Sequence, residues 1–353
     1  MNKIKHVLCA LLLCCCLPAC EKFELEKKAD TYFHIQSENA VLPVWVRGNT
    51  SSKKFIIFVN GGPGLTSIDV ALIDLLKWKD GLEKDFALVY YDQRGCGNVQ
   101  SNLSKEDISV GHYVRDLDAI IEVLKSKYSN PEIILMGHSF GSYISMEYLQ
   151  NADFQDKITA WISIDGAFNF DQELSWQFRR AFLDTIANEE LAKGKEIQHW
   201  QNALDWLDQN PVISTREQKK QWQDFIGRPG GIILPADELE ITGRELLKIG
   251  FDSPYNVFPA YFSTNLEIVN EVLNDEVEGK NFIAYAENIE IPSLFIWGKY
   301  DDLIVPQEGK TAFEKLASKP EDKEFILFEN SGHEPFLSEP IFFEATVANF
   351  LKK

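Results

Sequence analysis

The chain has 353 residues, of which 45% are hydrophobic and 25% charged, a composition typical of a globular protein with a buried core. Its length suits one large domain with an insertion or two ordinary domains. The formal net charge of −19 argues against a nucleic-acid partner, because the phosphates would be repelled. The same acidic field weakly favours substrates that carry a free amine.

The first 19 residues have the features of a cleaved export signal. Two lysines precede an apolar run, residues 7–19, which is too short to span a bilayer. The run ends in Leu17-Pro18-Ala19-Cys20, which resembles the lipobox of bacterial lipoproteins. We therefore expect an exported protein of the bacterial cell envelope, lipidated on Cys20 and held at a membrane through a tether at 20–30. An ordinary secretory signal is the alternative.

The cysteines are concentrated in this leader. Five of the six lie at or before position 20, so Cys96 alone remains in the mature chain and no internal disulfide is expected. No cysteine and histidine pair has the spacing of metal ligands, so we expect neither a metal site nor a cofactor.

Short apolar runs bounded by Gly and Pro alternate with helical patterns along the next part of the chain. Two strand-like pieces come first, at 31–36 and 41–47, and buried strands are predicted at 55–59, 86–91, 133–136, 158–164, 293–297 and 324–328. Helical periodicity occurs at 68–78, 114–124, 142–149 and 339–351. This alternation predicts an α/β fold with a doubly wound, mostly parallel sheet.

The alternation breaks between residues 169 and 288. This stretch is helix-like and rich in tryptophan, and it contains no strong strand run. We expect it to be a helical cap inserted between two parts of the core, 31–168 and 289–353. Ligands of such sheets bind at the carboxyl ends of the strands, so the cap is expected to cover the site.

A candidate nucleophile, Ser139, lies in the segment Gly137-His138-Ser139-Phe140-Gly141. A predicted strand comes directly before this segment and a predicted helix directly after it, as in a nucleophile elbow. Such a turn exposes the hydroxyl group, and the helix N-terminus adds backbone N–H groups and a positive dipole.

A serine nucleophile requires a base, and the base requires an acid that orients it. His333 follows the last predicted strand within a loop, where a base is expected, whereas His138 shares the turn of Ser139 and is expected to point elsewhere. Asp301 and Asp302 both follow the preceding strand, and either suits the role of the acid. We therefore expect catalysis by serine, histidine and aspartate.

The loop Asn60-Gly61-Gly62-Pro63-Gly64 follows the strand at 55–59, where enzymes of this type place one oxyanion donor. The backbone N–H groups of Gly62 and Phe140 are the expected donors to the developing oxyanion. Loss of one such donor typically costs about 3 kcal/mol of transition-state stabilisation.

These segments together resemble prolyl aminopeptidases (proline iminopeptidases), peptidase family S33 of the α/β hydrolases. The matching segments are Gly61-Gly62-Pro63-Gly64, Asp92-Gln93-Arg94-Gly95-Cys96-Gly97, Gly298-Lys299-Tyr300-Asp301 and Gly332-His333-Glu334-Pro335-Phe336. The resemblance runs from about residue 31 to the C-terminus and implies an α/β-hydrolase fold. It also implies Ser139 as nucleophile, Asp301 as acid and His333 as base, in the chain order of that fold.

Departures from the family pattern concern specificity. Asn60 replaces the usual leading histidine, and residues 137–141 replace the usual Gly-Gly-Ser-Trp-Gly, changes that resemble esterase-like members. The acidic cap residues that bind the substrate amine in the family have no recognisable motif here. Glu189-Glu190 and Asp237-Glu238 are candidates because they are acidic and lie in the cap, and a solvated helix surface is the alternative.

The sequence therefore predicts a serine hydrolase that works through an acyl-enzyme on a small-molecule or short-peptide substrate. Resemblance implies an aminopeptidase of the proline iminopeptidase type, which releases an N-terminal residue from short peptides. A carboxylesterase or lipase-like enzyme for small esters is the alternative, followed by a non-catalytic binding lipoprotein. The oligomeric state is left open.

Overall fold

A computed structural model describes residues 28–99, 103–227, 243, 247, 251 and 266–353. Its centre is an eight-stranded sheet of order β1-β2-β4-β3-β5-β6-β7-β8. The first two strands pair antiparallel, β2 also pairs antiparallel with β4, and the remaining neighbours are parallel. The strands are β1 (Lys28–Ser37), β2 (Ala40–Asn49), β3 (Lys54–Val59), β4 (Ala87–Tyr91), β5 (Glu132–His138), β6 (Ile158–Ile164), β7 (Ser293–Gly298) and β8 (Lys323–Phe328).

Both faces of the sheet are covered by helices, which explains the continuous apolar strands. In β3, Phe55, Ile57 and Val59 face one hydrophobic cluster, whereas Ile56 and Phe58 face the other. The first cluster includes residues of α3 (Val110–Lys127), α4 (Phe140–Leu149), α11 (Leu266–Val277) and α12 (Pro306–Lys315). The second includes residues of α2 (Leu82–Asp85), α13 (Pro335–Ser338) and α14 (Pro340–Leu351).

The remaining core connections are short. They are α5 (Ala152–Gln155) and the 3-10 helices η1 (Thr50–Ser52), η2 (Val70–Leu72), η3 (Asp74–Leu76), η4 (Lys105–Asp107), η5 (Ile283–Asn288) and η6 (Pro320–Asp322). The helix predicted at 68–78 was wrong: two 3-10 turns stand there, separated by Ile73 in an extended conformation. The apolar spacing still buries Ile68, Leu72 and Leu76 against the sheet, and short turns do so without an α-helix.

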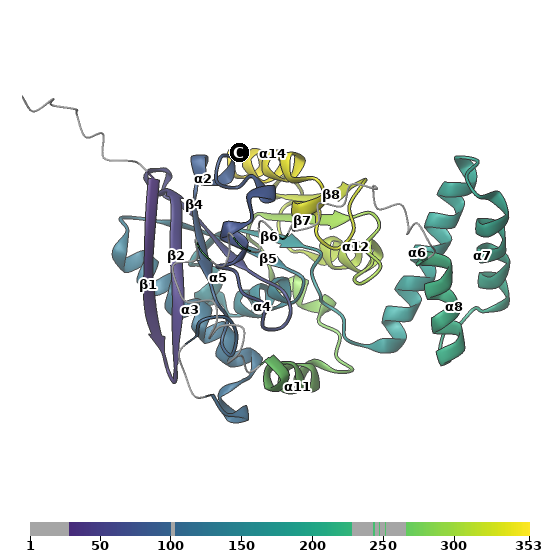
Figure 1. Cartoon of the computed structure of the whole chain (residues 1–353), viewed down its shortest axis with the longest axis horizontal. Helices are drawn as coiled ribbons and strands as arrows, with labels where there is room; N and C mark the ends of the chain where they lie inside the picture. The colour runs from purple at the N-terminus through teal and green to yellow at the C-terminus, as the bar shows by residue number, and fades with distance from the viewer. Residues whose placement is uncertain (1–27, 100–102, 228–242, 244–246, 248–250, 252–265) are drawn as a thin grey trace, which may run out of the picture.

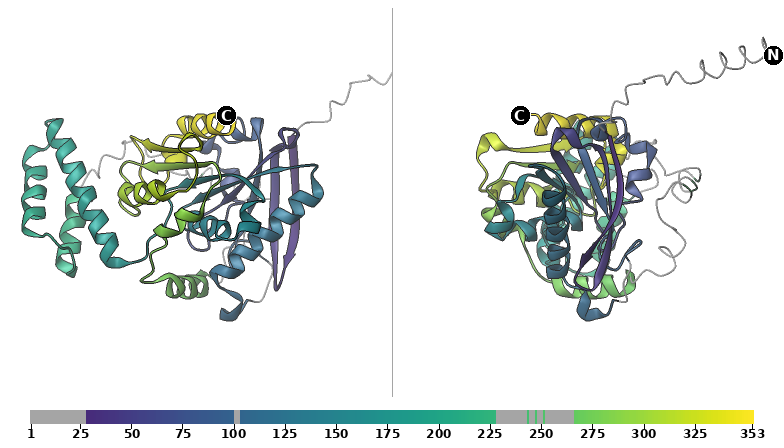
Figure 2. Two further views of the ribbon diagram at one scale, coloured as in Figure 1. Left: turned by 180° about the vertical axis from the view of Figure 1, so that it is seen from behind. Right: turned by 90° about the vertical axis from the view of Figure 1, so that its left-hand side faces the viewer.

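Three helices of the insertion form a separate packing unit, α6 (Gln172–Ala192), α7 (Ile197–Gln209) and α8 (Arg216–Ile226). Their hydrophobic cluster contains the fully buried rings of Trp200 and Trp222, and it also includes Tyr300 and Val305 from the core loop after β7. Figures 1 and 2 show these helices at one end of the molecule, opposite the edge formed by β1 and β2. Two later segments of the insertion, α11 and η5, pack on the core cluster instead. The boundaries of the cap, 169 and 288, stay a prediction.

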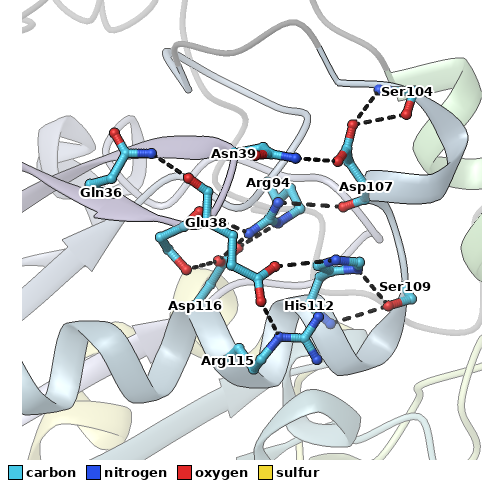
Figure 3. Close-up of polar contacts among 11 residues, drawn as sticks. Gln36, Glu38, Asn39, Arg94, Ser104, Asp107, Ser109, His112, Arg115 and Asp116 are labelled. Atoms are coloured by element: carbon cyan, nitrogen blue, oxygen red, sulfur yellow. Dashed lines mark hydrogen bonds and ion pairs between the residues drawn. The ribbon is translucent and has the colours of Figure 1, made fainter.

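The segment after β4 forms a buried polar corner, shown in Figure 3. Arg94 is fully buried, and its guanidinium donates two hydrogen bonds to Asp116 of α3, at 2.9 and 2.6 Å. Ser37, at the end of β1, donates to the same carboxylate at 2.5 Å. The corner therefore joins β1, the β4 loop and α3.

The predicted fold class is confirmed, since the sheet is mostly parallel, helices lie on both faces and a helical unit is inserted. Within the described ranges, no helix is long and apolar enough to cross a membrane. Cys96 is buried and free of disulfides.

Candidate active site

Ser139 lies at the turn between β5 and α4 in a strained conformation. Its φ is 53° and its ψ −122°, values that a residue with a Cβ adopts only when the surrounding fold enforces them. The enforcing contacts include the bond from its N–H to Ile164 O at 2.9 Å. A Cβ on Gly141 would stand 2.0 Å from Val59 O, so only glycine lets the helix approach the neighbouring strand this closely.

His333 and Asp301 meet at the carboxyl ends of β8 and β7. The two atoms His333 Nδ1 and Asp301 Oδ2 are 2.8 Å apart, so the ring donates to the carboxylate. Asp301 is fully buried, and its Oδ1 accepts from the N–H groups of Leu303 and Ile304, each at 2.9 Å. This arrangement fixes the tautomer of the ring and leaves Nε2 as the free basic nitrogen.

The electrostatic environment favours the protonated form of His333. Burial by itself would lower the pKa of its imidazole, but the charge and hydrogen bond of Asp301 outweigh burial and raise that pKa above its usual value. Asp302, the other candidate acid, has an exposed side chain. Of the two neighbours, the structure thus places Asp301 on the histidine.

His138 contacts the loop that carries His333, a contact that the sequence reasoning missed. Its Nε2 lies 2.9 Å from the backbone oxygen of His333, and because a carbonyl only accepts, Nε2 carries the hydrogen. Burial, followed by the charge of His333, lowers the pKa of His138 to about 3. The ring is therefore neutral at ordinary pH and anchors the main chain of His333.

The glycine loop after β3, residues 60–64, is held by hydrogen bonds of two side chains, Asn60 and Gln93. Asn60 accepts from Gly61 N at 2.8 Å through its side chain and donates to Thr66 O at 2.7 Å. Gln93 donates to Asn60 O at 2.7 Å. Gly62 has a φ of +119°, which a residue with a Cβ rarely adopts, so glycine suits this turn.

Ser139, Gly62 and Phe140 line one pocket of about 230 Å³. Phe140 is the first residue of α4, so its N–H belongs to the unsatisfied first turn of that helix. The other polar side chains of the pocket come from Asn169, Ser175, Arg179, Asn274 and Glu308. The pocket therefore brings the predicted nucleophile and both predicted oxyanion donors together.

The acidic cap candidates do not line this pocket where they are described. Glu189 pairs with Lys299 of the core at 2.7 Å, and Glu190 is buried and pairs with Lys193 at 2.7 Å. Asp237-Glu238 and Cys20 lie outside the described residues.

Asp165 follows β6 and was also missed. Together with His138 and His333 it forms a group whose possible ligand atoms lie within 4.8 Å of one another. Tetrahedral zinc holds its ligand atoms about 3.4 Å apart, and each histidine already uses one ring nitrogen in a hydrogen bond. Hydrogen bonding around the Asp301–His333 pair accounts for the grouping of these side chains. No sequence signal pairs His138 or Asp165 with His333, because both meet it only through the folded sheet.

The fold and the arrangement at the strand ends define the class of protein. The family model described as alpha/beta hydrolase fold matches residues 54–340, and the chain belongs to this family. A hydrolase is thus supported by the family as well as by the site.

Two relatives with assigned names are similar to this chain over most of its length. The chain is 26% identical to the probable aminopeptidase YbaC of Bacillus subtilis over 309 residues, covering 86% of this chain and 90% of that protein. It is 24% identical to a proline iminopeptidase of Chitinophaga pinensis over 329 residues, covering 90% and 97%. The predicted resemblance to prolyl aminopeptidases is confirmed by these relatives.

Solved structures agree in fold. The crystal structure of a proline iminopeptidase from Mycobacterium smegmatis superposes with a TM-score of 0.59 at 17% identity, covering 91% of this chain and 98% of that one. A thermophilic esterase from Thermogutta terrifontis gives a TM-score of 0.54 at 15% identity, with the same coverage. At these identities the likeness extends to the fold alone.

Proposed function

We propose that this protein is a serine hydrolase that forms an acyl-enzyme and cleaves short peptides with a free N-terminus. The observation that carries the proposal is the 2.8 Å contact between His333 and Asp301, at the same edge of the sheet as the strained turn of Ser139. The contact holds Nδ1 and frees Nε2, so that the imidazole acts as a general base.

The residues suggest a complete reaction path. His333 Nε2 takes the proton of Ser139 as the hydroxyl oxygen attacks the substrate carbonyl. The N–H groups of Gly62 and Phe140 hold the developing oxyanion. The intermediate collapses when His333 returns the proton to the leaving amine, and an acyl-enzyme remains. Water, deprotonated by His333, then attacks the ester and frees Ser139.

The character of the pocket supports a peptide over a lipid substrate. Its volume of about 230 Å³ is small, and its walls are mixed: polar side chains such as Arg179 and Asn169 stand beside apolar ones such as Phe170, Ile304 and Val305. The polar side chains can pair with amide and charged groups, whereas a fatty acyl chain would leave them unpaired, which costs free energy. The names of the curated relatives, aminopeptidase and proline iminopeptidase, agree with this substrate class.

Small esters are the second candidate substrate. The supporting observation is that Asn60 stands where the resembled peptidases usually carry histidine, and that residues 137–141 also depart from their pattern. Amino-acid p-nitroanilides and p-nitrophenyl esters, tested side by side, distinguish the two. Ester hydrolysis without amide cleavage would overturn the peptidase assignment.

A fluorophosphonate probe tests the serine-hydrolase chemistry directly. We expect the wild type to be labelled and Ser139→Ala to lose labelling completely, because the probe requires an activated serine. Ser145→Ala is the matched control: Ser145 is buried in the same helix and donates to Gly141 O at 2.8 Å. It should keep its labelling. An unlabelled wild type would contradict the enzyme assignment and favour a non-catalytic binding protein.

We also propose, from the residues before position 21 alone, that the protein is exported and carries a lipid on Cys20. The apolar run and the following cysteine support this location.

A further inference from the structure

Asp165 is a buried acid that the reaction path above does not use. It is fully buried directly after β6, and its Oδ1 accepts from Gly298 N at 2.9 Å. Its Oδ2 is also buried and meets no hydrogen-bond donor among the described residues. A buried carboxylate oxygen without a donor is costly, so the position calls for a physical cause.

Asp165 lies beside Asp301. Its Oδ1 accepts from Gly298 N, three residues before Asp301, and its carboxyl group lies within 4.8 Å of a ring nitrogen of His333, which Asp301 holds. Two carboxylates present no proton to each other, so these two acids can hydrogen-bond only if one of them is protonated. The two carboxyl groups accept different numbers of hydrogen bonds from other donors. Asp301 accepts three hydrogen bonds, from His333 and two backbone N–H groups, whereas Asp165 accepts one. The negative charge is therefore better placed on Asp301.

The surrounding charges point the same way. Burial, followed by the charge of Asp301, raises the pKa of Asp165 well above its usual value, and Glu334 adds to the rise. His138 is neutral at ordinary pH, because its pKa is lowered to about 3. His333 is the only cationic side chain, when protonated, in the group that His138, Asp165 and His333 form.

We propose that Asp165 is a positioning residue of this site: its protonated carboxyl donates from Oδ2 to Asp301 and so orients the carboxylate that holds His333. The inference rests on the proposed serine-hydrolase function. The shared proton has two effects: it removes a second negative charge from beside the base, and it supplies Asp301 with one more donor. Asp301 is thereby held from the β6 side as well as by its own loop.

Two substitutions distinguish a role of Asp165 as hydrogen-bond donor from a role in packing alone. Asp165→Asn keeps an oxygen for Gly298 N, which fixes the amide so that its NH2 donates to Asp301. Asp165→Leu has a similar size and no donor. The readout is the rate of fluorophosphonate labelling from pH 5 to pH 9, whose acid limb reports the ionisation of His333.

In Asp165→Asn, we expect the plateau rate to stay within about fivefold of wild type and the acid limb to move by less than about 0.3 pH units. In Asp165→Leu, the plateau should fall about 10- to 100-fold, the usual range for losing a hydrogen bond to a charged group. Its acid limb should move to higher pH, because the less compensated charge of Asp301 favours the imidazolium. A merely structural role would lower the plateau and leave the limb in place.

The opposite protonation state predicts a different result. If Asp165 were ionised, Asp165→Asn would remove a negative charge near His333 and shift the acid limb down by about one pH unit. That shift overturns the inference, as does a limb that stays unchanged in a folded Asp165→Leu. Should Asp165→Leu not fold, the limb of Asp165→Asn decides alone.

Controls keep this inference apart from the proposed function. Ser163→Ala, on the same strand, removes a buried hydroxyl that donates to Ser142 at 3.1 Å and does not contact Asp301. Its acid limb should coincide with that of the wild type. A wild type that is not labelled refutes the hydrolase proposal and this inference together. A labelled wild type with a shifted Asp165→Asn limb refutes this inference alone.

Discussion

At the scale of single residues, Glu308 shows how burial controls an acid in the pocket. Its Oε1 accepts from the N–H groups of Phe168 and Asn169, at 3.1 and 3.0 Å, yet burial outweighs these bonds and raises its pKa to about 8. The carboxyl group therefore remains protonated in the folded protein at neutral pH, while the unfolded chain releases this proton near about pH 4.3.

This difference predicts a pH-dependent stability. Between about pH 4.3 and 8 the folded state binds more protons at Glu308, so the free energy of unfolding falls as pH rises, by at most about 1.4 kcal/mol per pH unit. Glu308→Gln cannot ionise and still accepts both N–H bonds. Urea unfolding at pH 5.5, 7 and 8.5 should show the wild type losing stability relative to Glu308→Gln. Glu314→Gln, exposed on the same helix, should follow the wild type; parallel curves for all three proteins would contradict the prediction.

The residues of the site were predictable to different degrees. Ser139, His333 and the pair Asp301 and Asp302 were predicted because each lies within a few residues of the end of a recognisable strand. The residue pattern left the choice between the two aspartates open, because it depends on which side chain the loop turns inward, and only the resemblance indicated Asp301. His138 and Asp165 were missed because their partners lie far along the chain and meet them only when parallel strands align.

At the scale of elements, the corner of Arg94 joins β1 and α3 to the loop after β4. Removing Arg94 would leave Asp116, which is buried, without its partner, and breaking such a buried pair typically costs about 3–5 kcal/mol. We therefore expect Arg94→Met to lower the free energy of unfolding by this order, measured by urea denaturation at pH 7.

An exposed arginine in the same view provides the matched control (Figure 3). Arg115 pairs with Glu38 at 2.7 Å on the surface, so Arg115→Met should cost less than about 1 kcal/mol. The double variant Arg94→Met with Asp116→Leu should recover part of the loss, because no charge then remains buried. If Arg94→Met and Arg115→Met lowered the free energy of unfolding equally, the buried pair would contribute no more to stability than the surface pair.

Strands were predicted better than short connections. The apolar runs of β3, β5, β6 and β7 are short, buried on both faces and closed by glycine or polar turns, so local pattern and tertiary environment agree. The segment 68–78 has helical spacing over a few residues only. Its turns are set by packing against the sheet, which the spacing does not encode.

At the scale of the whole molecule, the inserted helices are joined to the core by apolar and polar contacts. Tyr300 and Val305, in the loop after β7, belong to the hydrophobic cluster of α6–α8. Lys299, directly after β7, pairs with Glu189 of α6, and Arg179 of α6 donates to Leu303 O at 2.7 Å. Both contacts lie in the loop that carries Asp301. The helical unit is thus attached to the same strand-end loop as the acid of the site, at the end of the molecule away from β1 (Figure 1).

Attachment at a membrane would use the opposite edge. The chain from 21 to 27 separates Cys20 from β1, and seven extended residues reach about 25 Å. With a lipid on Cys20, the start of β1 would lie within this distance of the membrane, and α6–α8 are at the other end of the molecule (Figure 1). We predict that a fatty-acid label is incorporated into the wild type and not into Cys20→Ser, whereas Cys16→Ser, in the apolar run, keeps the label. Label incorporation is the deciding measurement, because an uncleaved leader also holds a chain at the membrane. A labelled Cys20→Ser would refute this anchor, and an unlabelled wild type that is nevertheless cleaved would favour an ordinary secretory signal.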